Sequence, residues 1–218
     1  MNIWDLSAVN VAYFVSGGGS NFENLEQVFR QEPGKVRGKL VISNRAGTGA
    51  QSRAATLGLP FLILKPDLFN SQQAYEDQLN SLLLDNDIHL ICLAGYLKKL
   101  PDSTVHRWEN RILNIHPSLL PAFGGPGMYG RHVHEAVLKR GCKLTGATVH
   151  LVTPDYDAGP IIAQEAVPVL QDDTPDSLQK RVLTMEHQLY PQVVDLITST
   201  PWTIENNQFK IRNQHENH

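Results

Sequence analysis

The sequence is poor in cysteine, has no long apolar segment and carries no strong excess of either charge. Two cysteines, Cys92 and Cys142, are too few and too far apart for a disulfide framework or a CxxC metal pair. The net charge of −3 gives no reason to expect nucleic acid or an anionic membrane as partner. We therefore expect small-molecule partners and no metal site.

The first ten residues lack the basic segment and apolar run of a signal peptide, and no stretch has the roughly 20 apolar residues of a membrane span. A cytoplasmic protein is the default expectation. With 218 residues, 41% of them hydrophobic, the chain can bury a core without cross-links. We expect a single domain over residues 1–218, with a short polar C-terminal tail from about residue 207.

Short apolar runs alternate with helical patterns, which predicts βαβ units in an α/β fold with a Rossmann-like, doubly wound, mainly parallel sheet. Strands are expected at Val9–Val15, Leu40–Ile42, Phe61–Leu64, Ile88–Leu93, Arg111–Ile115, Thr145–Val152 and Ile161–Val169. Helices are expected from Ser20, near Ala50–Thr56, over Ser71–Leu84, and from an N-cap at Thr174 along an apolar stripe to Leu196. The glycine- and proline-rich stretch from Pro117 to Arg131 predicts a functional loop.

A glycine-rich segment, Ser16–Asn21, follows the first expected strand and opens a helix. Backbone N–H groups and the positive helix end converge at such a turn, which favours an anion, most often phosphate. A tight turn without a ligand is an equally good interpretation of this segment alone. A dinucleotide site is weaker, because Phe22 replaces the third glycine of that fingerprint, although Asn44 and Arg45 would suit the 2′-phosphate of NADP.

Asn114 and His116 are two residues apart near the end of an expected strand, so their side chains share one face. An amide and an imidazole side by side can stabilise an oxyanion and move a proton. Asp157, in the turn 153–160, would raise the pKa of His116 if the fold brought the two together. The alternatives are a strand-end pair that caps loop backbone and an aspartate that only forms a turn.

The remaining histidines favour structural interpretations. His150 lies among apolar residues of an expected strand, which is typical of a hydrogen-bonded core histidine. His132 and His134 lie in the long loop without further ligands, so solvent exposure or helix capping is favoured over a metal.

Taken together, these segments resemble the glycinamide ribonucleotide formyltransferase family, the folate-dependent enzymes of purine synthesis. The strongest match is Asn114–Pro121, which reads Asn-Ile-His-Pro-Ser-Leu-Leu-Pro. The other matching motifs are Ser16–Asn21, Leu93–Tyr96, Val149–Thr153, Asp157–Pro160 and Glu186-His187. The resemblance runs from about Val9 to about Pro201 and implies a formyltransferase fold.

The resemblance implies transfer of a formyl group from the co-substrate 10-formyltetrahydrofolate to the amine of glycinamide ribonucleotide, by a monomer or homodimer. It assigns the catalytic group to Asn114, His116 and Asp157. It places the substrate phosphate at Gly19, Ser20 and Asn21 and the ribose at Glu186. It places the folate against Leu97, Lys98, Lys99, Leu100, Asn114, Thr153, Pro154, Asp155, Tyr156 and Asp157.

Several alternatives stay open from the sequence. The glycine-rich segment Gly124–His134 is also similar to the corresponding loop of formyltetrahydrofolate deformylases, which hydrolyse the same folate. A formyltransferase acting on another phosphorylated amine, an NADP-dependent oxidoreductase and a phosphate-binding module without turnover are further alternatives.

Overall fold

The computed structural model describes residues 2–31 and 34–212, and seven strands in this part form one sheet. The spatial order is β3-β2-β1-β4-β5-β6-β7, with parallel pairing from β3 to β5 and antiparallel pairing of β6 and β7. The strands are β1 (Val9–Val15), β2 (Val36–Ser43), β3 (Phe61–Ile63), β4 (Leu90–Leu93), β5 (Ile112–His116), β6 (Leu144–Leu151) and β7 (Ile161–Pro168). This order confirms the doubly wound, mainly parallel prediction and puts the switch point between β1 and β4.

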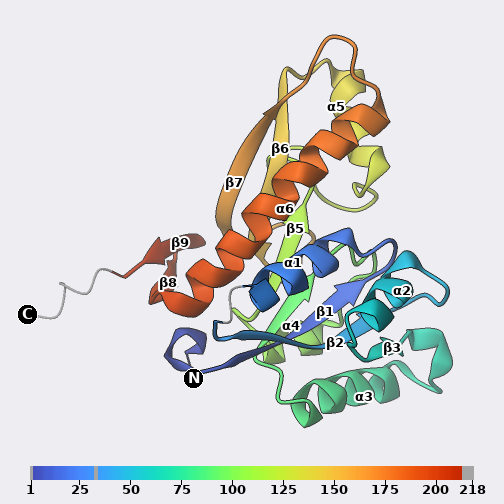
Figure 1. Cartoon of the computed structure of the whole chain (residues 1–218), viewed down its shortest axis with the longest axis vertical. Helices are drawn as coiled ribbons and strands as arrows, with labels where there is room; N and C mark the ends of the chain where they lie inside the picture. The colour runs from blue at the N-terminus through green and yellow to red at the C-terminus, as the bar shows by residue number, and fades with distance from the viewer. Residues whose placement is uncertain (1, 32–33, 213–218) are drawn as a thin grey trace, which may run out of the picture.

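Helices cover both faces of the sheet (Figure 1). Residues of α1 (Ser20–Gln31), α2 (Gly49–Thr56), α5 (Arg131–Arg140) and α6 (Pro175–Ser199) belong to one apolar cluster. Residues of α3 (Gln72–Asp85) and α4 (Asp102–Arg107) belong to the other. Of the two short helices, η1 (Ile3–Asp5) contributes Ile3 to the first cluster, and η2 (Pro66–Leu68) has no buried residue. Side chains of β1 alternate between the clusters, with Tyr13 in the first and Phe14 in the second, as expected for a strand buried on both faces.

The elements that the sequence patterns did not predict include α4, α5 and a C-terminal hairpin of β8 (Trp202–Glu205) and β9 (Gln208–Ile211). The expected polar tail from about residue 207 includes β9, which pairs with β8, and its residues 213–218 lie outside the described part. Asn206 and Asn207, both with positive φ, form the turn that this hairpin requires. Trp202 stacks against Phe209 with ring centroids 5.4 Å apart, which ties β9 to the core.

The connection from β6 to β7 returns very tightly at Gly159. The Leu151 N–H donates to the Pro160 carbonyl oxygen over 2.9 Å. A Cβ on Gly159 would lie 1.8 Å from the Leu151 carbonyl oxygen, so only glycine allows this approach of the two backbones. The return places Asp157, two residues earlier, against side chains of β5 and β6.

We expect Gly159→Ala to destabilise the fold by about 1–3 kcal/mol, because the added methyl group must displace backbone. Gly17→Ala is the matched control, since a Cβ there would meet nothing within 4 Å. Urea denaturation of both variants measures the free energy of unfolding. Equal stabilities for Gly159→Ala and the wild type would contradict the close approach.

Candidate active site

The candidate site lies where β1, β4 and β5 end, next to the switch point of the sheet. Open α/β sheets bind ligands outside the carboxyl ends of strands at such a point. The Ser16 N–H donates to the Gly95 carbonyl oxygen over 3.0 Å, and the Leu97 N–H donates to Ser16 Oγ over 2.8 Å. These bonds hold the glycine-rich loop after β1 against the segment that follows β4.

Asn114 on β5 lies opposite His150 on β6 in the strand register. Asn114 Nδ2 is 3.1 Å from His150 Nε2, and His150 Nδ1 is 2.9 Å from the Leu151 carbonyl oxygen. A carbonyl oxygen only accepts, so Nδ1 carries a proton, and Nε2 lies beside the Asn114 amide. His150 thus orients Asn114 and leaves the second N–H of the amide for a ligand. His150 is buried and hydrogen-bonded, as expected of a core histidine, and it also contacts the Asn114 amide at the site.

Asp157 lies between two imidazole rings. Its Oδ2 is 3.7 Å from His116 Nδ1, and its Oδ1 is 3.6 Å from His150 Nε2. The Gly125 N–H donates to Oδ2 over 2.8 Å, while His116 Nε2 donates to the Phe123 carbonyl oxygen over 2.8 Å. The fold therefore brings together the carboxylate and the imidazole that sequence spacing could not connect, and it anchors both to the segment 123–125.

The surroundings favour a neutral His116 beside an ionised Asp157. Burial lowers the pKa of His116 below its usual range, although the Asp157 carboxylate and the Phe123 carbonyl raise it. The expected rise in the His116 pKa from Asp157 is present, but burial outweighs it. Burial raises the pKa of Asp157, but contacts with His150, the Gly125 N–H and His116 lower it by more. The net pKa of Asp157 is therefore below its usual range. The imidazole can therefore accept a proton, and the carboxylate then stabilises the resulting cation.

His134 is the residue whose surroundings differ most from expectation. It lies inside α5, is buried and has a pKa of about 4, because burial and the neighbouring His116 disfavour its charge. Its Nδ1 has no hydrogen-bond partner in the described part of the chain. The prediction of a solvated or capping His134 is wrong, because the apolar stripe of α5 turns this side chain inward.

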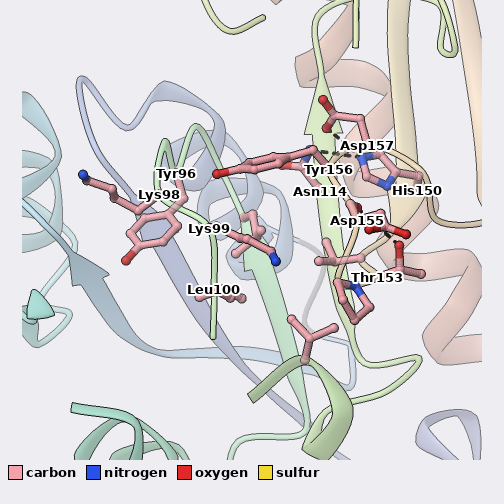
Figure 2. A pocket seen from close by; sticks show the side chains of 14 residues that line it. Tyr96, Lys98, Lys99, Leu100, Asn114, His150, Thr153, Asp155, Tyr156 and Asp157 are labelled. Carbon is pink, nitrogen blue, oxygen red and sulfur yellow. Dashed lines mark hydrogen bonds and ion pairs between the residues drawn. The ribbon is translucent and has the colours of Figure 1, made fainter. Parts of the chain in front are cut away.

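A cavity opens beside this cluster. Figure 2 shows Asn114, His150 and Asp157 on one side of it, with Tyr96 and Lys98 on the other. Most of the residues expected at a folate site line it: Lys98, Lys99, Leu100, Asn114, Thr153, Pro154, Asp155, Tyr156 and Asp157. The sequence interpretation missed Leu93, Tyr96, Val105, His150 and Val152, which also line it. Apolar walls with a few convergent polar groups are typical of small-molecule sites.

A second cavity meets the first at the catalytic cluster. It is lined by segments 95–98, 114–117 and 125–130 together with Tyr156 and Asp157. Leu97, expected at the folate, lines this second cavity. Asn114 and Asp157 line both cavities, so two ligands in the two cavities would meet at these side chains.

The glycine-rich loop and α6 meet at a buried polar contact. Asn21 Nδ2 donates to Glu186 Oε2 over 2.7 Å. Burial raises the pKa of Glu186 to about 7, although the bond from Asn21 opposes the rise. Asn21 Oδ1 is buried and has no partner among the described residues. The fold therefore brings together Asn21 and Glu186, which lie far apart in the sequence and were expected at one substrate.

Comparison with known proteins places this arrangement in a family. The family model described as "Formyl transferase" matches residues 9–194. The chain belongs to the formyl transferase family. A phosphoribosylglycinamide formyltransferase of Bacillus subtilis (strain 168) is 33% identical over 183 residues, which cover 84% of this chain and 91% of the relative.

Other members of the formyl transferase family are similar along most of the chain. The chloroplastic phosphoribosylglycinamide formyltransferase of Arabidopsis thaliana is 44% identical over 190 residues, 86% of this chain and 64% of the relative. The chain thus spans less than two thirds of the length of that relative. The crystal structure of glycinamide ribonucleotide transformylase 1 from Symbiobacterium toebii superposes with a TM-score of 0.88 at 36% identity, covering 95% of each chain.

Two general features of the described residues bear on ligands and membranes. No group of three or more His, Cys, Asp or Glu side chains among them could hold a metal ion. None of the described helices is both long enough and apolar enough to cross a membrane.

The raised pKa of Glu186 predicts a specific pH dependence of stability. The unfolded carboxyl ionises near pH 4.5 and the folded one near 7, so the wild type loses stability as the pH rises between these values. Glu186→Gln removes this loss and keeps an acceptor for Asn21. Between pH 4.5 and pH 8, we expect the free energy of unfolding of the variant to rise by up to about 3 kcal/mol relative to that of the wild type.

Urea denaturation at the two pH values measures this difference. Glu165→Gln, on the exposed face of β7, is the matched control and should leave the pH dependence unchanged. A Glu186→Gln variant that loses stability with pH as the wild type does would contradict the assignment.

Proposed function

We propose that this protein transfers a formyl group from 10-formyltetrahydrofolate to the amine of glycinamide ribonucleotide and so forms N-formylglycinamide ribonucleotide in purine biosynthesis. The observation that carries the proposal is the meeting of two cavities at Asn114 and Asp157. A transferase must bring donor and acceptor together at one set of catalytic groups. The similar proteins with this activity in their names support the choice of both substrates.

The folate occupies the cavity between the segment after β4 and the loop 153–157 in this proposal. Tyr96, Leu100 and Val152 offer the apolar surface that a flat pterin ring needs, and Asn114 offers an amide N–H. Lys98 and Lys99 at the rim would attract the carboxylates of the glutamate tail. Leu97, which lines the second cavity, would lie between the two substrates.

The acceptor occupies the second cavity, with its phosphate at Gly19, Ser20 and Asn21. The first N–H groups of a helix have no partners within the helix, and the helix dipole favours an anion there. Glu186, already bonded to Asn21, would accept hydrogen bonds from the ribose hydroxyl groups.

The proton balance of the reaction fits the resting state of His116. The acceptor amine adds to the formyl carbon, and neutral His116 takes a proton from this nitrogen. The resulting imidazolium, supported by Asp157 and together with the free N–H of Asn114, stabilises the oxyanion at the formyl oxygen. His116 then returns the proton to the folate nitrogen as its bond to carbon breaks. A new C–N bond replaces the old one without net change in protonation.

We further propose that residues 1–218 act as a single formyltransferase domain in the cytoplasm, as a monomer or homodimer. Its partners would be the two small-molecule substrates, with no nucleic acid and no membrane. The net charge of −3 supports this, because it provides no general attraction for polyanions.

His116→Ala tests the catalytic assignment. Loss of the group that moves the proton should lower kcat about 10²–10⁴-fold, with little change in thermal stability. His106→Ala, on the exposed side of α4, is the control and should keep wild-type kcat. Formyl transfer is followed by the absorbance of the released folate. Full activity in His116→Ala would remove His116 from the mechanism.

Asp157→Asn tests the electrostatic pairing. The carboxylate raises the pKa of His116, so its removal should shift the acidic limb of the kcat/KM profile to lower pH. The rate itself should fall, because the imidazolium formed during the reaction loses its counter-charge. An unchanged acidic limb in Asp157→Asn would show that Asp157 does not act on His116.

A further inference from the structure

The back of the glycine-rich loop is formed by α2, an element with no role in the mechanism above. The Ala50 N–H donates to the Gly17 carbonyl oxygen over 3.2 Å. One turn later, Arg53 Nε donates to the Gly18 carbonyl oxygen over 3.0 Å. Two successive carbonyl groups of the loop are therefore fixed by donors from the same helix.

These two bonds determine where the N–H groups of the loop point. A trans peptide is planar, and its C=O and N–H point in opposite directions. The peptides after Gly17 and Gly18 are trans. Because their oxygens face α2, the N–H groups of Gly18 and Gly19 face away from it. In residues 2–31 and 34–212, neither N–H group donates to another residue.

The two sides of the loop differ in how much space they leave. A Cβ on Gly19 would lie 2.7 Å from Ala50 Cβ, and one on Gly49 would lie 3.2 Å from the Gly18 carbonyl oxygen, so the side towards α2 is closed. A Cβ on Gly17 or Gly18 would meet nothing within 4 Å. The loop ends at Asn21, whose buried Oδ1 has no hydrogen-bond partner in the described residues.

The charge of Arg53 is already paired within the protein and is therefore not free to bind a ligand. Its guanidinium forms an ion pair with Glu23, in the first turn of α1. The neighbouring His187 stays neutral, because burial and the charge of Arg53 both lower its pKa. A phosphate at the loop would therefore be bound mainly by backbone N–H groups, whose orientation becomes decisive.

We propose that Arg53 is a positioning residue for the acceptor phosphate: through its bond to the Gly18 carbonyl it turns the Gly19 N–H toward the phosphate. The proposal rests on the phosphate site proposed above at Gly19, Ser20 and Asn21. Arg53 itself does not touch the substrate. Its removal frees the Gly18–Gly19 peptide to rotate, so the loop loses a preorganised donor.

The test measures KM for glycinamide ribonucleotide, KM for its dephosphorylated riboside and inhibition by inorganic phosphate. In Arg53→Ala we expect KM for the ribonucleotide and the inhibition constant of phosphate to rise about tenfold, the loss of about one hydrogen bond to a charged group. KM for the riboside, KM for the folate and kcat should change less than twofold. The KM values and the inhibition constant of phosphate do not depend on the fraction of enzyme that is folded. The value of kcat does, and it is corrected by active-site titration.

Glu23→Gln is the matched control. It removes the ion pair but keeps the Arg53 bond to Gly18, so it should not weaken the binding of phosphate. The proposal fails if Glu23→Gln reproduces the Arg53→Ala effect, or if Arg53→Ala raises KM for riboside and ribonucleotide equally.

Ser20→Ala separates this inference from the phosphate site on which it rests. If Ser20→Ala weakens phosphate inhibition and Arg53→Ala does not, the site stands and the role of Arg53 is wrong. If neither variant changes phosphate inhibition, the phosphate does not lie at this loop, and both proposals are contradicted.

Discussion

The position of Asp157 is the constraint on which the rest of the site depends. One half-buried carboxylate contacts His116 from β5, His150 from β6 and the backbone of Gly125. No single element could supply all of these partners. The tight return at Gly159 and the antiparallel pairing of β6 with β5 bring them together. Asp157 has a φ of 52°, a strained value for a residue other than glycine, and its three polar contacts offset that strain.

The same contacts link binding to chemistry. Asn114, which His150 orients, and Asp157 line both cavities, so both substrates would contact these two side chains. Burial lowers the pKa of His116, and the adjacent carboxylate would stabilise the cation that forms when the ring takes up a proton. A group that is poised in this way is stabilised more in the transition state than in the ground state, which is the requirement for catalysis.

Local patterns predicted the fold well because the strands of a parallel sheet are short apolar runs that the sequence displays directly. The six-residue helix α4 is too short to show a helical period, and α5 was hidden by the glycine-rich segment before it. A stronger signal for α5 was present in Val133 and Val137 and in Gly141, which ends the helix in the left-handed conformation.

The site was predictable only in part. Asn114 and His116 share a strand face, so their proximity follows from a two-residue period. The contacts Asp157–His116, His150–Asn114 and Glu186–Asn21 join residues that are 36 to 165 positions apart, and no local pattern encodes them. The contact of His150 with Asn114 was not predicted, because apolar neighbours in a strand do not reveal the cross-strand partner. The bond from Arg53 to the Gly18 carbonyl oxygen was not predicted either, because the two residues are 35 positions apart in the sequence.

The central claim is that two substrates meet at Asn114, His116 and Asp157. The most direct measurement is the release of folate from 10-formyltetrahydrofolate by the wild-type protein, followed by absorbance with and without glycinamide ribonucleotide. Turnover that requires the ribonucleotide, with one folate released per amine formylated, is the predicted result. Equal turnover without any amine would contradict the account, because water would then be the acceptor and the protein a deformylase.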